Sequence, residues 1–250
     1  MRTSAKITGG AVVILLVISI LIWAAAVRED RRGLVSVSFL SAGKSGVVFI
    51  DAPSGRKVLI DGGSDTSIPR VLGKVLPWWD RSIDVVISAH PDAAHATGLI
   101  DVLQRYSVAS VFTSSAPGTG PVWLTFEKTI VDAQKKGTSV ATLQRGQVID
   151  LGKGAYIEVL FPDRDLSGAT ASAGCIEMLL VYRATSFMLS CGNPAIENYL
   201  ARLDGSALHA DALYSSGATS SPMFAGFVGA QFVAHKGETF VSDGNTVKSE

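Results

Sequence analysis

The chain has 250 residues, of which 47% are hydrophobic and 18% are charged. This composition supplies enough apolar side chains for one main folded domain, and it excludes an intrinsically disordered protein. Lysine and arginine total 22, as do aspartate and glutamate, so the overall charge indicates neither a nucleic-acid binder nor an enzyme for acidic substrates. Any such role therefore depends on a local site.

The first segment with a clear pattern is an uncharged apolar run over residues 9–27, with charged residues on both sides. Its length is close to the ~20 residues that a helix needs to cross a hydrocarbon core of ~30 Å. We therefore expect a membrane anchor and charged linker over residues 1–33, followed by one domain over residues 34–250. This predicts a single-pass membrane protein, and an uncleaved anchor most simply places the domain outside the cytoplasm.

Two alternatives stay open for the apolar run: a buried core helix, and a cleaved signal peptide whose cleavage site uses the alanines at 24–26. Lysine and arginine are nearly balanced on the two sides of the run, so the orientation also stays open.

Behind the linker, short apolar runs alternate with Gly, Pro, Ser and Asp, a pattern typical of strands. We expect strands at residues 34–40, 46–52, 57–63, 84–90, 110–115, 155–161, 177–183, 186–192, 211–216, 231–235 and 238–243. We expect helices at residues 68–76, 96–106, 122–136 and 194–203. Strands in both halves with helices between them predict an α/β fold of sheets covered by helices.

The densest polar cluster lies over residues 88–98, between an apolar strand and a helix. It contains His90, Asp92 and His95, and two imidazoles with a carboxylate at this spacing suit a divalent metal. On spacing alone, the alternative has equal weight: His90 and Asp92 cap the strand and the following turn, and His95 lies on the helix surface.

This segment carries a resemblance to a known family. Residues 90–98, H-P-D-A-A-H-A-T-G, resemble the S-H-P-D-A-D-H-x-G-G segment of ComEC-type competence proteins, the membrane channel components of bacterial DNA uptake. Residues 39–46 resemble the family's F-x-D-V-G-Q-G-D motif, and residues 53–63 its P-x-G-x-x-x-L-I-D-G-G motif. Residues 188–193 stand where the family has L-L-T-G-D, and residues 213–222 stand where it has L-x-x-x-H-H-G-S-x-x-S-S-x-P.

These ordered matches extend along most of residues 34–250. They imply the fold of the family's C-terminal domain, a metallo-β-lactamase-like αββα four-layer sandwich, here with an N-terminal transmembrane helix. In the family, a dinuclear metal site uses the His/Asp cluster, a bridging Asp and a later His-His pair. Here the second Asp of the cluster is Ala94, the bridging Asp is Asn193, and the His-His pair is Ser215-Ser216.

These substitutions remove ligands that two dications need, because paired dications repel and require anionic groups. Ala94 offers no ligand, and Asn193 is a weak ligand with only a neutral carbonyl oxygen. Serine hydroxyls replace imidazole poorly. One metal position retains His90 and Asp92, and the other retains His95. Neither reaches the three protein ligands usual for a catalytic zinc.

We therefore expect a degenerate domain with no assignable catalytic residue, no nucleotide cofactor and no bound metal. Its expected role is binding or assembly linked to DNA uptake, with DNA or a DNA-uptake membrane component as partner. The alternative is a phosphodiesterase or nuclease that binds Zn²⁺ or Mn²⁺ at the residual site.

Four further features carry expectations. Ser215-Ser216 followed by Gly217 suggests a serine nucleophile, but that reading requires a base and an oxyanion hole that the sequence does not identify. The turn at Asp61 is expected to serve the backbone only. Trp78-Trp79 are expected to be partly buried packing rather than a binding patch. Cys175 and Cys191 match no metal or redox spacing, so free thiols and a disulfide both stay open.

Overall fold

The computed structural model describes residues 12–23, 33–217 and 219–250. The chain divides into two compact units, Met1–Arg32 and Gly33–Glu250. Each unit is described by itself.

The first unit corrects the predicted membrane anchor. Its helix is described over residues 12–23, a stretch of about 18 Å at 1.5 Å per residue. Within the described residues, no helix is long and apolar enough to cross a membrane. The remainder of the 9–27 run lies outside the described residues. The predicted single-pass membrane localisation is therefore wrong.

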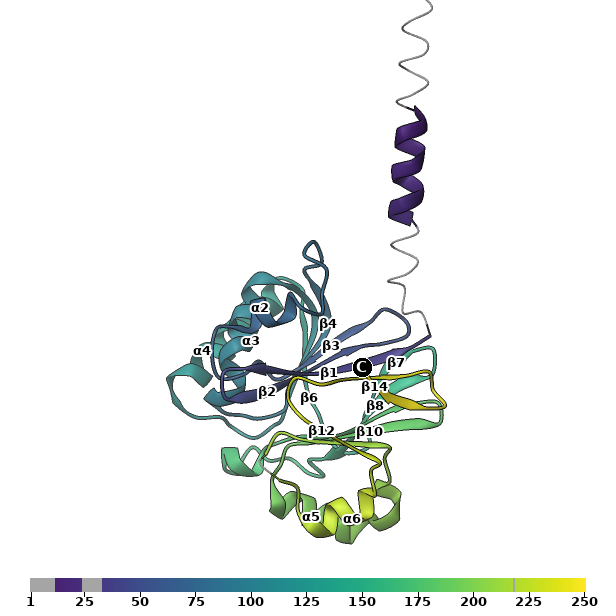
Figure 1. Cartoon of the computed structure of the whole chain (residues 1–250). Coiled ribbons are helices and arrows are strands. Elements are labelled where there is room, and N and C mark those ends of the chain that lie inside the picture. Colours follow the sequence, from purple (N-terminus) through teal and green to yellow (C-terminus); the bar gives the residue numbers. More distant parts are fainter. Residues whose placement is uncertain (1–11, 24–32, 218) are drawn as a thin grey trace, which may run out of the picture. The chain divides into compact units, whose positions relative to one another are not determined.

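The second unit contains two mixed β-sheets (Figure 1). The larger has the strand order β14-β13-β1-β2-β3-β4-β5-β6. Its strands are β1 (Val35–Ala42), β2 (Ser45–Asp51), β3 (Lys57–Ile60), β4 (Ser82–Ser88), β5 (Ser107–Thr113), β6 (Ser139–Thr142), β13 (Thr239–Ser242) and β14 (Val247–Ser249). The smaller has the order β12-β11-β10-β9-β8-β7. Its strands are β7 (Val148–Gly152), β8 (Ala155–Phe161), β9 (Glu177–Tyr182), β10 (Thr185–Ser190), β11 (Ala212–Ser215) and β12 (Phe232–Ala234).

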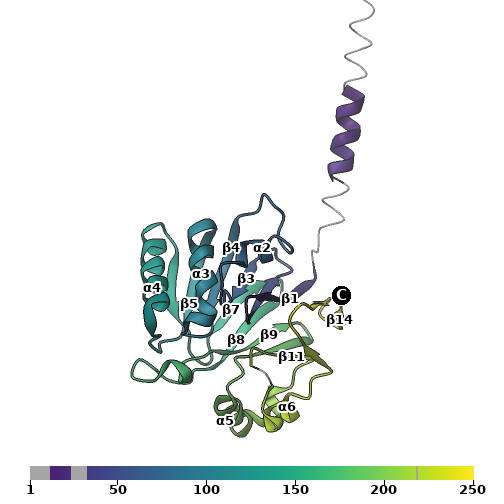
Figure 2. The same cartoon turned by 60° about the vertical axis from the view of Figure 1, so that its left-hand side comes forward.

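Helices cover the outer face of each sheet (Figure 2). The larger sheet packs against α2 (Ile68–Leu72), α3 (Ala93–Arg105) and α4 (Gly120–Lys135). The smaller sheet packs against α5 (Pro194–Asp204) and α6 (Pro222–Val228). Two 3₁₀ turns, Ala171–Ala173 and Gly205–Leu208, complete the helical segments of this unit. The αββα four-layer arrangement expected from the sequence is confirmed.

The alternation of side chains along the strands produces this layering, because successive residues of a strand point to opposite faces. In β3, Val58 and Ile60 belong to the core between the sheets, whereas Leu59 packs under the helices of the larger sheet. Each sheet is therefore apolar on both faces, as two covered layers require.

The sequence analysis did not predict three of the observed strands, β6, β7 and β14. β6 and β14 are edge strands of the larger sheet, and β7 is an edge strand of the smaller sheet. Each is short, and most of its residues are exposed or half-buried. An edge strand with little buried surface carries little apolar pattern for a sequence to reveal.

The topology brings four strand ends together. β3 and β4 are parallel neighbours in the larger sheet, and β10 and β11 are parallel neighbours in the smaller one. The carboxyl ends of parallel neighbours lie at the same edge of a sheet, so residues that follow these strands lie close in space.

The larger sheet and α3 meet at two glycines. The Gly62 N–H donates to the His95 carbonyl at 2.7 Å, and the Gly98 N–H donates to the Gly63 carbonyl at 3.4 Å. A Cβ atom at Gly98 would overlap the carbonyl group of Gly62. Backbone therefore packs directly on backbone where α3 crosses the end of β3.

We predict that Gly98→Ala lowers the free energy of unfolding by about 1–3 kcal/mol, because backbone atoms cannot move aside as a flexible side chain does. This loss outweighs the ~1 kcal/mol that alanine gains over glycine inside a helix. Urea unfolding of the full chain measures it. Gly226→Ala in α6, where a Cβ meets nothing within 4 Å, is the matched control and should leave stability unchanged or higher. Equal changes in the free energy of unfolding for the two substitutions would contradict the close backbone contact between α3 and the end of β3.

Candidate functional site

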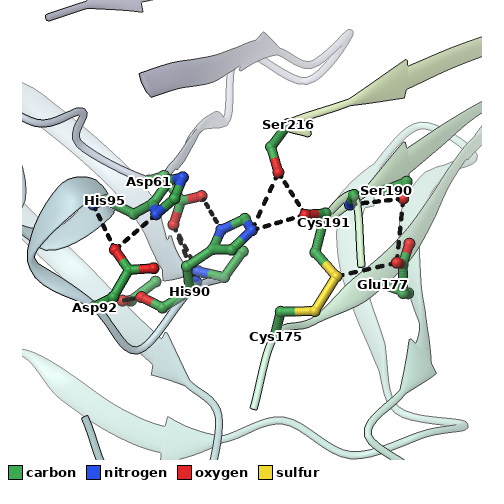
Figure 3. A network of polar contacts seen from close by, with 12 residues as sticks. Asp61, His90, Asp92, His95, Cys175, Glu177, Ser190, Cys191 and Ser216 are labelled. Carbon is green, nitrogen blue, oxygen red and sulfur yellow. Dashed lines mark hydrogen bonds and ion pairs between the residues drawn. A yellow bond between two sulfur atoms is a disulfide. The ribbon is translucent and has the colours of Figure 1, made fainter. Parts of the chain in front are cut away.

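The candidate site lies where the four strand ends meet (Figure 3). Asp61 directly follows β3, and His90 lies two residues beyond β4. Cys191 directly follows β10, and Ser216 directly follows β11. The site therefore joins the two sheets at one edge of the sandwich.

Asp61 is buried and binds the segment after β4. One carboxylate oxygen, Oδ1, accepts the backbone N–H of Ala89 at 2.8 Å and that of His90 at 3.3 Å. The other, Oδ2, lies 2.7 Å from Nδ1 of the His90 ring. The expectation that Asp61 serves the backbone only is therefore wrong, because its side chain forms an ion pair inside the site.

The second nitrogen of His90 also faces an acceptor. Nε2 lies 3.1 Å from the Cys191 carbonyl oxygen and 3.1 Å from the Ser216 hydroxyl. That hydroxyl itself donates to the Cys191 carbonyl at 2.7 Å. A carboxylate and a carbonyl accept hydrogen bonds only, so a His90 ring that satisfies both carries a proton on each nitrogen.

The electrostatics agree with this protonation state. Burial on its own would lower the pKa of His90, but the charge and hydrogen bond of Asp61 outweigh it and raise the pKa to about 9. The Cys191 carbonyl and the charge of Asp92 act in the same direction. His90 is accordingly an imidazolium at neutral pH.

His95 and Asp92 form a second pair at the start of α3. Asp92 is the N-cap residue of this helix, and its Oδ1 accepts the His95 backbone N–H at 3.1 Å. The same oxygen lies 2.8 Å from the His95 ring nitrogen Nδ1. Burial would raise the pKa of Asp92, but the contacts with His95 lower it. The rings of His90 and His95 stack with centroids 3.9 Å apart.

The structure brings some of the sequence-predicted residues together and leaves others out. His90, Asp92, His95 and Ser216 converge (Figure 3). Asn193 lies at the N-terminus of α5, where its oxygen accepts the Ala195 N–H and its amide donates to the Ser172 carbonyl.

Neither of the remaining two predicted positions joins the site network. Ala94 is exposed in the first turn of α3. The Ser215 hydroxyl is buried and has no hydrogen-bond partner among the described residues. Of the seven predicted positions, four therefore converge, and Ala94, Asn193 and Ser215 do not.

The cysteines form a disulfide, Cys175–Cys191, directly beside the site (Figure 3). Disulfide sulfurs lack the negative charge that makes cysteine a metal ligand. Close to the disulfide, the Ser190 hydroxyl lies 3.1 Å from Glu177 and 2.7 Å from Glu197. Burial, reinforced by the nearby charge of Glu197, raises the pKa of Glu177 to about 8.

The donor set does not fit the dinuclear metal centre that the sequence resemblance implies. Asp61, His90 and His95 have ligand atoms within 4.8 Å of one another and form the only cluster of imidazole and carboxylate donors found among the described residues. Both nitrogens of His90, however, are committed to acceptors. The cavity that His90, Asp61 and Ser216 line has a volume of about 20 Å³, room for about one water molecule.

We predict that the His90–Asp61 pair makes folding stability depend on pH. The folded pKa of about 9 lies above the ordinary value of 6.5, so the pair contributes fully below pH 6.5 and its contribution is lost as the pH rises through 9. The loss is on the order of 3 kcal/mol. Urea unfolding across this range measures it.

Glu177 also makes the free energy of unfolding fall as the pH rises, since its pKa is raised from 4.5 to about 8. Glu177→Gln removes this contribution to the pH dependence. Against that background, Asp61→Asn should abolish most of the remaining pH dependence. An unchanged dependence in Asp61→Asn would contradict the ion pair.

Solved structures with similar folds include several metallo-β-lactamase fold proteins. YhfI from Bacillus subtilis superposes with a TM-score of 0.51 and 14% identity, over 81% of this chain and 88% of that chain. Zn²⁺-bound PqqB from Methylobacterium extorquens gives 0.49 and 12%, over 74% and 72% of the two chains. MEM-A1, a subclass B3 metallo-β-lactamase from a soil metagenome library, gives 0.48 and 16%, over 71% and 75%. No protein-family model and no curated protein matches the chain. Together with the four-layer architecture, the match to YhfI shows that this chain has the metallo-β-lactamase fold.

Proposed function

We propose that this domain is a metal-independent binding module, a degenerate ComEC-type domain on the metallo-β-lactamase fold. One observation carries the proposal: each ring nitrogen of His90 faces an oxygen that only accepts hydrogen bonds. A metal ligand must present a bare nitrogen lone pair, which this arrangement disfavours.

The imidazolium performs the structural work expected of a metal. It supplies positive charge at the junction of four strand ends, and it connects Asp61 after β3 with Cys191 after β10. Ser216 after β11 contacts both His90 and the Cys191 carbonyl. A cation would have to displace a proton and break the Asp61 ion pair, at a cost set by the raised pKa of His90.

The ordered sequence matches to ComEC-type domains make DNA, or another component of a DNA-uptake system, the first ligand to test. Trp78 and Trp79 supply a contact surface for it. They are 81% and 64% exposed, contrary to the expected packing role, with rings 5.6 Å apart. Unpaired bases stack on such aromatic side chains.

A second candidate is a hydrolase with one metal ion, favoured by the proximity of Asp61, His90 and His95. One carboxylate with two imidazoles is a set that suits Zn²⁺ or Mn²⁺. It would require His90 to release a proton and leave one of its two acceptors.

Metal content separates the two candidates. We predict that the full chain, purified without chelators and then offered Zn²⁺ or Mn²⁺, retains far less than one ion per chain and does not cleave DNA. Elemental analysis and a nuclease assay measure this. One ion per chain, lost in His90→Ala and kept in the control His209→Ala, would establish the metal-dependent candidate instead.

We predict that Trp78→Ala with Trp79→Ala weakens binding of a single-stranded oligonucleotide by at least about fivefold, since stacking contributes ~1–3 kcal/mol per base. Fluorescence anisotropy measures the affinity. Leu124→Ala, which removes another exposed apolar side chain, serves as the control and should bind as the unaltered chain does. No binding by the unaltered chain would remove DNA as the ligand.

A further inference from the structure

Three side chains of the site form a continuous relay from hydroxyl to imidazole to carboxylate. The Ser216 hydroxyl lies 3.1 Å from His90 Nε2, and Asp61 Oδ2 lies 2.7 Å from His90 Nδ1 (Figure 3). This is the connectivity of a serine hydrolase triad, which is recognised by geometry rather than by position in the sequence. The sequence did not identify a base for Ser215-Ser216, and the fold places His90 beside Ser216 in that position.

We propose that Ser216 is a nucleophile toward carboxylic esters, with His90 as its general base and Asp61 as the residue that positions His90. The inference rests on the proposed metal-independent site, because a metal bound to His90 would occupy the nitrogen that the hydroxyl requires.

The surroundings suit each role. Asp61 is buried and fixed by the Ala89 N–H, so it sets the orientation of the His90 ring. Ser216 is half-buried and its neighbour Gly217 is exposed, so the nucleophile lies close to the surface of the domain. The Ser216 backbone N–H donates to the Ser190 carbonyl at 3.0 Å, so the nucleophile sits on an ordered strand end.

The candidate oxyanion donor is the backbone N–H of Gly217. The residue after the nucleophile supplies such a donor in many serine hydrolases. Gly217 also packs backbone to backbone against Gly192, where a Cβ on Gly192 would overlap Gly217. The two glycines permit this close approach beside the serine.

Activation requires one proton to leave. In the resting arrangement the Ser216 hydroxyl donates to the Cys191 carbonyl and His90 holds both protons. When His90 loses the Nε2 proton, the hydroxyl need only rotate toward a nitrogen already 3.1 Å away. Asp61 keeps the remaining proton on Nδ1, which is the tautomer that a general base needs.

The reaction then balances with water as the only co-reactant. Ser216 Oγ bonds to the ester carbonyl carbon while its proton passes to His90 Nε2. The bond from that carbon to the leaving oxygen breaks, and the alcohol takes the proton from His90. Water, deprotonated by His90, attacks the acyl-serine, releases the carboxylic acid and restores the Ser216 hydroxyl.

The test is covalent labelling of the full chain in EDTA, followed from neutral to alkaline pH. The probe for the adduct is a fluorophosphonate, whose product the deacylation step does not remove, and p-nitrophenyl acetate reports turnover through release of p-nitrophenol. Intact mass spectrometry should show one adduct per chain, and peptide mapping should place it on Ser216. Ser216→Ala should abolish it, and the neighbouring control Ser215→Ala should retain it.

Asp61→Asn tests whether Asp61 positions the His90 ring for the reaction or only stabilises the fold. It should slow labelling by about 10²-fold or more and should change the pH profile of labelling, because Asp61 contacts the His90 ring directly. Circular dichroism checks that each variant is folded. His90→Gln, which keeps a polar side chain, should also lose the adduct.

Two results would overturn the inference: no adduct on the unaltered chain, or equal labelling in folded Ser216→Ala. Either result in protein shown to be free of metal leaves the proposed function intact. Stoichiometric metal on His90 would instead overturn the proposed function. The labelling experiment does not depend on that result, because EDTA removes the metal before labelling.

Discussion

An imidazolium–carboxylate pair, half-buried His90 with buried Asp61, connects the two sheets of this protein at one edge. Asp61 follows β3 and accepts two backbone N–H groups after β4, so the pair depends on the parallel register of these strands. On the other sheet, Cys191 and Ser216 close the network. Burying this much polar chemistry is favourable only when each group is matched, and breaking one partner would leave an uncompensated charge. The residues after the four strands supply these matching partners for His90 and Asp61.

In the proposed function, the same pair takes the place of the metal centre that the sequence resemblance implies. A metal centre supplies positive charge that draws carboxylates and imidazoles inward, and here a protonated histidine supplies that charge instead. The positions that the sequence resemblance aligns with metal ligands make ordinary structural contacts. Asn193 caps α5, and Ser216 connects His90 to the Cys191 carbonyl. The stacked His95, bound to Asp92, completes the first turn of α3.

Much of the fold could be predicted from the sequence, because the core strands carry strong alternation of apolar residues. Val58, Leu59 and Ile60 divide between two cores as the pattern requires. The edge strands β6 and β14 could not be predicted, since they bury little apolar surface.

The convergence of His90, Asp92 and His95 follows from their spacing, and that of Ser216 from its place in an ordered motif. Asp61 was missed because its role appears only when β3 and β4 pair in parallel. An acid directly after a buried strand was the available signal. The predicted membrane anchor was wrong, because no helix among the described residues is long and apolar enough to cross a membrane.

The protonation state of the His90 ring is the most direct test of this account. In full-length protein enriched in ¹⁵N and purified without chelators, NMR of the side chain at neutral pH distinguishes a doubly protonated ring from a neutral or metal-bound one. We predict that both nitrogens of His90 carry protons, with a through-bond signal for each. A neutral tautomer at neutral pH, or a nitrogen shifted by a bound metal, would contradict it.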